Sequence, residues 1–264
     1  MAENSTFLFL LTLCSDLAPV AAILLFLAPL PTIYNVYTKQ AVRDLPLLPY
    51  SSMVSNAFLW CTYGVLKHEP AVFVSNGVGL IMGSFYCAIY INYSQDFPVA
   101  IEPPEMKPCS HKKSHFHLFG MALVVAVCLT IATATFLDVA VRREIIGIMG
   151  IVACVALFAS PLAALQTVIE KKSAASIPLP FTVASGANCL LWTITGFFQM
   201  HDLNIIVPNT LGLFCALVQV ALKITYQETS GKGYCFFGTN MEIGGDDKLT
   251  TLLKGSEGSV QTVA

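Results

Sequence analysis

Apolar and polar positions follow each other along the chain in long blocks. Seven apolar blocks approach or exceed the ~20 residues that a helix needs to cross the hydrocarbon core of a bilayer. They span residues 8–30, 46–66, 71–93, 117–138, 145–168, 178–199 and 203–226. Most connections between them are short and polar. The pattern therefore predicts an all-α integral membrane protein with seven transmembrane helices.

A large part of this pattern occurs twice. Residues 56–64 recur as residues 188–196, 132 positions later, and the two tryptophans of the chain occupy equivalent places in these segments. One additional residue then changes the offset to 133, so that Asn76 is matched by Asn209. Such a register over about 70 residues indicates an internal duplication.

The duplication predicts the order of the domains. It covers the first three and the last three blocks and leaves 117–138 unmatched. Two three-helix units joined directly would point in opposite directions, and one additional span restores a common direction. We therefore expect 3+1+3 parallel triple-helix-bundle repeats joined by a linker helix. The expected parts are a first repeat (1–93), a cytoplasmic loop with linker helix 4 (94–144), a second repeat (145–226) and a disordered cytoplasmic tail (227–264).

Composition places this chain in a membrane. Hydrophobic residues make up 55% and charged residues 11% of the sequence, whereas soluble domains carry about a quarter charged residues. The net charge of −2 gives no reason to expect a nucleic-acid partner. The nine cysteines contain no CxxC pair and are interpreted as small buried side chains. His111, His115 and His117 are interpreted as a solvated loop, so neither a metal nor another cofactor is expected.

Lysine and arginine counts predict the orientation. With the N-terminus outside, the inside segments hold eleven of these residues and the outside segments three. This bias follows the positive-inside rule, so we expect the N-terminus outside and the C-terminus in the cytoplasm. The plasma membrane is the favoured location, with an internal membrane (Golgi or vacuole) as the alternative.

Polar residues within the apolar blocks predict a binding site. Asn56 and Trp60 are four positions apart, so they share a helix face, and the second repeat has the same pair. Buried amides must face the bundle interior or a wet cavity. Two indoles and several amides suit a neutral polyhydroxylated ring, although Asn can also hydrogen-bond neighbouring helices and Trp can lie at the interface. The candidate substrate-binding residues are Asn56, Trp60, Asn76, Asn188, Trp192 and Asn209.

Four prolines near the cytoplasmic ends of the spans predict hinges. Proline removes a backbone donor and clashes with the preceding turn, so it can kink a helix, although any single proline could simply mark a helix end. Their arrangement by the repeat favours a gate. They are Pro29, Pro49, Pro161 and Pro178.

The chemistry of the spans favours passive transport. Residues 45–66, 71–95, 145–169 and 173–201 contain no charged residue, whereas proton and ion relays usually show them. No nucleophile–base constellation, phosphate-binding loop or pair of catalytic carboxylates is present, so an enzyme is not expected.

The motifs resemble the SWEET sugar transporters over roughly residues 18–226. The matching segments are Ala28-Pro29, Leu48-Pro49-Tyr50, Trp60-Cys61-Thr62-Tyr63-Gly64, Ser75-Asn76-Gly77, Ser160-Pro161-Leu162, Lys171-Lys172-Ser173, Trp192, Gly196 and Val207-Pro208-Asn209. The resemblance implies bidirectional sugar uniport by alternating access and assembly into oligomers, often trimers. It implies that Asn76, Asn209 and Trp192 bind the sugar opposite Trp60. It also implies a cytoplasmic proline tetrad (Pro29, Pro49, Pro161 and Pro178) and an extracellular gate at Tyr63 and Asp202, which the additional residue before Asn209 makes asymmetric.

The size of the expected pocket favours a hexose. Leu25, Leu157, Asn56 and Asn188 lie where relatives that take disaccharides tend to have smaller residues, so we expect glucose rather than sucrose. A related PQ-loop carrier, coupling protons to amino acids or other small solutes, should show Pro-Gln dipeptides and buried acids, which the sequence lacks. A seven-span receptor is a further alternative with the same topology, but that function does not require a parallel repeat of three helices.

Overall fold

The described part of the protein is almost entirely helical, as predicted. The computed structural model describes residues 2–42, 45–94, 111–174, 177–226, 235–236 and 239–240. Its helices are α1 (Ala2–Leu27), α2 (Leu30–Lys39), α3 (Leu48–Lys67), α4 (Pro70–Tyr93), α5 (His111–Thr133), α6 (Val139–Lys171), α7 (Leu179–Thr195), the π-helix η1 (Gly196–Met200) and α8 (Leu203–Thr225).

Two short strands, β1 (Cys235–Phe236) and β2 (Thr239–Asn240), pair in antiparallel fashion. They form an exception within the segment predicted to be a disordered tail. The rest of that segment lies outside the described residues, as does residue range 95–110 of the loop expected before the linker helix.

The helices match the predicted spans. Since α2 follows α1 after a break at Pro29 and η1 continues α7, the described residues form seven helical rods. Four stretches among them are long and apolar enough to cross a membrane, namely Ser5–Lys39, Pro70–Tyr93, Leu179–Met200 and Leu203–Thr225. The chain is therefore a multi-pass membrane protein.

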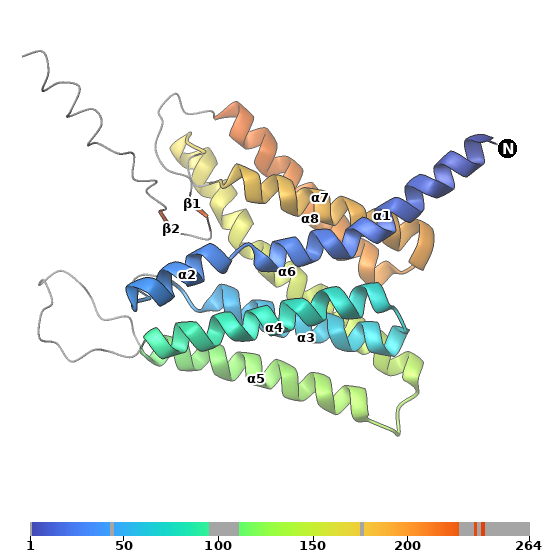
Figure 1. The fold of residues 1–264 in the computed structure, drawn as a ribbon, viewed down its shortest axis with the longest axis horizontal. Coiled ribbons are helices and arrows are strands. Elements are labelled where there is room, and N and C mark those ends of the chain that lie inside the picture. The colour runs from blue at the N-terminus through green and yellow to red at the C-terminus, as the bar shows by residue number, and fades with distance from the viewer. Residues whose placement is uncertain are drawn as a thin grey trace, which may run out of the picture.

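The packing of the helices has twofold pseudosymmetry (Figure 1). In the first half, α4 packs against both α1 and α3, and in the second half α8 packs against both α6 and α7. Between the halves, α1 packs against α7 and α3 packs against α6. Exchanging the halves converts one of these interfaces into the other, as parallel repeats require. The linker helix α5 packs against α3 and α6.

The backbone repeats as well. Among the described residues, four non-glycine positions have positive φ: Gln40 (49°), Lys172 (49°), His68 (61°) and His201 (49°). The first two are 132 positions apart and the last two 133, the offsets that the sequence pattern uses. Each residue follows a helix in the left-handed conformation that commonly ends helices. The duplication therefore extends to the details of helix termination.

The additional residue of the second repeat is taken up by the π-helix η1. In the first repeat, Glu69 N donates to Gly64 O across five positions (2.9 Å). In the second repeat, the equivalent bond joins Asp202 N to Gly196 O across six positions (3.1 Å). A π-helical turn holds one residue more than an α-turn, and such turns occur frequently at functional sites. The insertion thus leaves the rest of the repeat in register.

The four prolines do not behave alike. Pro29 lies at the break between α1 and α2, where Ala28 N donates to Leu25 O (3.2 Å) and the Tyr86 hydroxyl donates to Phe26 O (3.1 Å). Pro49 and Pro178 lie at helix starts, where a missing N–H costs little. The helix α6 continues without a break through Pro161. The helix is therefore interrupted at one of the four positions, while a hinge role for all four remains a prediction.

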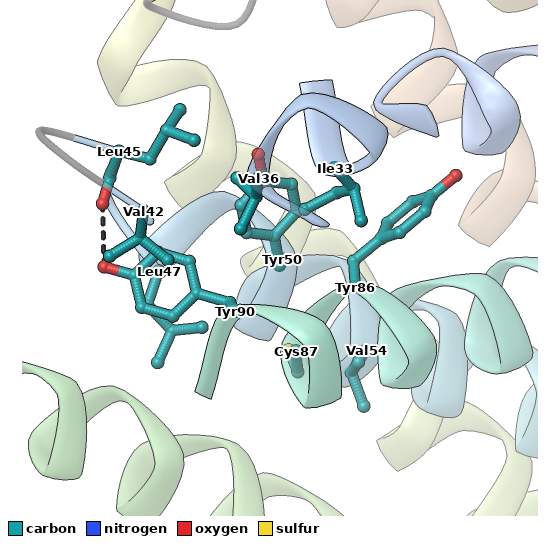
Figure 2. Close-up of a cluster of buried hydrophobic side chains, with 10 residues drawn as sticks. All are labelled: Ile33, Val36, Val42, Leu45, Leu47, Tyr50, Val54, Tyr86, Cys87 and Tyr90. Carbon is teal, nitrogen blue, oxygen red and sulfur yellow. Dashed lines mark hydrogen bonds between the residues drawn. The ribbon is translucent and has the colours of Figure 1, made fainter. Parts of the chain in front are cut away.

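Each half has its own hydrophobic cluster at the end that carries α2, here named the Tyr90 end. Figure 2 shows the cluster of the first half, in which the rings of Tyr50 and Tyr86 meet edge to face at 5.9 Å. The cluster of the second half contains Val168, Ala174 and Ile177, the equivalents of Val36, Val42 and Leu45. A third cluster, at the opposite end, contains residues of both halves.

Candidate functional site

The two tryptophans belong to one buried cluster between the halves. Trp60 on α3 and Trp192 on α7 are each 6% exposed and share this cluster with Leu59, Ile146 and Ile205. Helices α3 and α7 are equivalent in the repeat, so each half contributes one indole. The structure thus brings together the two aromatic residues that the sequence predicted for the site.

The tryptophan of the first repeat is held by its asparagine. Trp60 Nε1 donates to Asn56 Oδ1 (3.2 Å), the i, i+4 relation that the sequence suggested. Cys154 Sγ on α6 donates to the same oxygen (3.4 Å), which links the first half to the second. Gly150 on α6 leaves room for the indole, because a Cβ there would lie 2.9 Å from Trp60 Cζ2. Asn56 and Trp60 are therefore fixed against α6.

The equivalent pair of the second repeat is not joined. Asn188 Oδ1 is buried and has no hydrogen-bond partner, and among the described residues Trp192 Nε1 donates no hydrogen bond either. A buried acceptor without a donor costs about 1–3 kcal/mol. The second repeat therefore contributes unpaired polar groups where the first contributes a closed pair.

Asn76 and Asn209 have the same local geometry in both repeats. Asn76 Nδ2 donates to Val72 O (2.9 Å), and Asn209 Nδ2 donates to Ile205 O (2.8 Å), each one turn back in its own helix. Both residues are half-buried. Because only one amide hydrogen is used, each residue keeps its carbonyl oxygen as an acceptor and its second amide hydrogen as a donor.

The two leucines predicted to narrow the site differ in exposure. Leu25 on α1 is half-buried, Leu157 on α6 is exposed, and neither belongs to the cluster around Trp60 and Trp192. Among the described residues no group of three His, Cys, Asp or Glu could hold a metal ion. The side chains of His111 and His115 lie outside the described part of the chain.

A polar cluster, here named the Tyr63 cluster, joins the halves at the end opposite the Tyr90 end. The Tyr63 hydroxyl donates to Asp202 Oδ2 (2.6 Å), and Lys67 Nζ lies 3.2 Å from the same oxygen. Asn204 Nδ2 donates to Tyr63 Oη (3.2 Å) and to Glu144 Oε2 (3.2 Å). Asp202 is 5% exposed and also caps α8 by accepting from Asn204 N (3.0 Å).

Sequence reasoning found two of these five residues, Tyr63 and Asp202. Lys67 and Glu144 each lie just outside an apolar block, where the sequence gives no signal for a site. Asn204 follows a helix-capping aspartate by two positions, which is a signal for a helix start and not for a site. Cys154 resembled any small apolar residue. Whether these side chains reach the cluster depends on which face each helix turns toward it, and the sequence alone does not determine that rotation.

The two ends of the molecule differ in how far the halves are joined. At the Tyr63 end, the mixed cluster and the Tyr63 cluster connect α3 with α6, α7 and α8. At the Tyr90 end, each half packs its hydrophobic residues by itself. Figure 1 agrees, since the halves run side by side near the α3–α4 connection and spread toward α2.

Two parallel three-helix repeats of apolar helices define the architecture of a multi-pass membrane protein. A family model described as "Sugar efflux transporter for intercellular exchange" matches residues 12–96 and again residues 144–231. The chain belongs to this family of sugar transporters, which are not enzymes.

Individual relatives agree with this assignment. The chain is 27% identical to "Bidirectional sugar transporter SWEET8" of Arabidopsis thaliana, covering 85% of this chain and 91% of the relative. It is 30% identical to "Bidirectional sugar transporter SWEET7b" of Oryza sativa subsp. japonica, covering 79% and 75%. The fold is similar to the 3.7 Å structure of a eukaryotic SWEET transporter, with a TM-score of 0.67, 23% identity, and coverage of 82% of this chain and 98% of that one. Sugar transport is thus its activity.

Proposed function

We propose that the protein is a bidirectional facilitative uniporter that carries a hexose, with glucose preferred over a disaccharide. The observation that carries this proposal is the pair of tryptophans, one from each half, within a single cluster flanked by amides. Aromatic faces stack on the C–H surface of a sugar ring, while amides bond its hydroxyls. The relatives' description as bidirectional sugar transporters supports the direction of transport.

We assign the sugar to the region between the two tryptophans. Trp192 would stack on the ring with Trp60 on the opposite wall. Asn76 and Asn209 would each offer the sugar their carbonyl oxygen and the second hydrogen of their amide, which the bond within the helix leaves free. Leu25, Leu157, Asn56 and Asn188 would limit the size of the substrate, which supports a hexose.

We place the Tyr63 end outside and the Tyr90 end in the cytoplasm, with the N-terminus outside. In this arrangement the Tyr63 cluster is a closed extracellular gate, and Pro29, Pro49, Pro161 and Pro178 lie toward the cytoplasm, where they would bend to open and close the other side. The separate hydrophobic clusters at the Tyr90 end support a state that faces the cytoplasm. Alternating access would exchange these two arrangements.

The plasma membrane is the proposed location and a homo-oligomer, such as a trimer, the proposed assembly. A proton-coupled carrier of amino acids is the second candidate, because Asp202 is a buried carboxylate hydrogen-bonded to Tyr63. We favour the uniporter because Lys67 pairs with the Asp202 carboxylate. This ion pair gives Asp202 a structural role in the closed cluster, so the carboxylate need not carry a proton.

The test is uptake and efflux of radiolabelled glucose in vesicles that contain the purified protein. We expect flux in both directions, unchanged by an imposed proton gradient, and lower flux of sucrose. Trp192→Ala and Asn209→Ala should each reduce the flux strongly, whereas Phe214→Ala, on an exposed side chain of α8, should not. The absence of sugar flux would overturn the proposal, and amino-acid flux driven by protons would favour the second candidate.

A further inference from the structure

We propose that Asn204 is a positioning residue of the closed extracellular gate, and that Gly147 provides the space it needs. The inference rests on the proposed gating role of Tyr63 and Asp202, which it extends to two further residues. Neither residue was found from the sequence, and both lie in the second repeat, on α8 and α6.

The amide of Asn204 uses both of its hydrogens. One bond goes to Tyr63 Oη on the first half (3.2 Å) and the other to Glu144 Oε2 at the start of α6 (3.2 Å). Because an N–H already occupies the phenol oxygen, the hydroxyl hydrogen of Tyr63 is directed to Asp202 (2.6 Å). Asn204 therefore orients the bond that joins the halves.

The side chain of Asn204 has little freedom to move. The residue is 8% exposed, and its backbone nitrogen is held by Asp202 Oδ1 (3.0 Å) at the start of α8. Any other rotamer would leave the buried Tyr63 oxygen without its donor. The cluster therefore acts as a unit, in which the amide cannot be shifted without loss of the other bonds.

Gly147 packs directly against this amide and the Tyr63 ring. A Cβ at position 147 would lie 2.7 Å from Asn204 Cγ and Nδ2, and 2.9 Å from Tyr63 Cε2. These distances are shorter than van der Waals contact, so a methyl group would force α6 away from α3 and α8. Glycine at this position allows the two halves to close.

The experiment uses the full-length protein in intact cells and the native thiol of Cys154, which contacts Asn56 in the candidate site. A membrane-impermeant thiol reagent is added from outside, and mass spectrometry follows the labelling rate of the Cys154 peptide. We expect Gly147→Ala and Asn204→Asp each to raise this rate about tenfold, the change that loss of one buried hydrogen bond produces in a two-state population. Glucose uptake should fall in parallel.

Two double variants separate positioning from general damage. Asn204→Ala should add little to the labelling rate of Gly147→Ala, because both changes remove the same contact between Asn204 and Tyr63. Glu144→Gln should partly rescue Asn204→Asp, because it exchanges amide and carboxylate across the same bond. Gly120→Ala, where nothing lies within 4 Å, and Asn35→Asp, on an exposed residue, are the matched controls.

Labelling that stays at the wild-type rate in both single variants overturns the inference. So does the absence of any rescue of Asn204→Asp by Glu144→Gln, or a fully additive effect of Asn204→Ala on Gly147→Ala. If labelling responds as expected while no sugar is carried, the proposed function fails and the positioning role stands. If glucose is carried and labelling does not respond, only the inference fails.

Discussion

The two repeats share a backbone but differ in the side chains that stabilise it. At the Tyr90 end, the Tyr90 hydroxyl donates to Leu45 O (2.7 Å), and the equivalent Lys223 Nζ donates to Ala174 O at the same distance. In each half, a residue of the third helix thus fixes the loop between the first two. A neutral phenol and an ammonium group thus both donate to a loop carbonyl. The duplication has preserved the position of this hydrogen bond but not the chemical group that makes it.

A second pair of positions shows the same substitution. Where the first repeat packs Tyr50 against Tyr86, the second repeat has Thr182 and Gln219, whose side-chain oxygens are 3.2 Å apart in a hydrogen bond. An aromatic contact in one half is replaced by a polar contact in the other. Structural positions tolerate such exchanges because either contact holds the second and third helices together.

At the candidate site, by contrast, the difference between the repeats is what matters. Tyr63 and Asp202 are bonded, whereas the equivalent of Tyr63 is Thr195, whose buried Oγ1 has no partner. Likewise Asn56 and Trp60 form a pair, while Asn188 Oδ1 is unpaired. The gate and the candidate site therefore each use different side chains from the two halves. Equivalent substitutions in the two repeats should for this reason have unequal effects.

The largest expected effect comes from comparing the two tryptophans. Trp192→Ala should lower glucose flux on the order of 100-fold, since truncating a Trp at the centre of a binding site costs at least about 2 kcal/mol of binding energy. Trp60→Phe should lower it less than Trp192→Phe if the free ring nitrogen of Trp192 serves the sugar. Equal decreases in flux for the two Phe variants would show that the two tryptophans do not differ in function. Flux in vesicles, corrected for the amount of folded protein, is the measurement.

The next effect concerns the additional residue of η1. Deleting Phe197, which is exposed, should convert the π-turn to the α-turn of the first repeat and draw Asp202 away from Tyr63. We expect outside labelling of Cys154 to rise on the order of tenfold. Deletion of Phe136, an exposed residue in the turn before α6, is the matched control. Unchanged labelling after the Phe197 deletion would show that the insertion does not set the gate.

The smallest effect concerns the loop contacts at the Tyr90 end. Tyr90→Phe and Lys223→Met should each lower the free energy of unfolding by about 1–3 kcal/mol, because a carbonyl loses its donor. Thermal unfolding in detergent checks this, with the exposed Tyr34→Phe and Lys39→Met as controls. A decrease for only one variant would mean that the equivalent bonds do not stabilise the two repeats equally.

The sequence was sufficient for much of the fold because hydrophobic blocks and repeated motifs are linear features. The offset change from 132 to 133 even located the place where the structure has a π-turn. It was not sufficient for Asn204, Glu144 and Cys154, since their contacts depend on how helices face each other. The sequence also provided no means of telling Pro29, where the helix is interrupted, from the equivalent Pro161, through which α6 continues.

The most direct test of the central claim is counterflow. Vesicles containing the purified protein are loaded with unlabelled glucose and diluted into a trace of radiolabelled glucose without any ion or proton gradient. An alternating-access uniporter should accumulate label transiently inside, and Trp192→Ala should abolish the accumulation. If label only equilibrates without an overshoot, or if the overshoot persists in Trp192→Ala, then two halves that exchange around a sugar held by their tryptophans do not describe this protein.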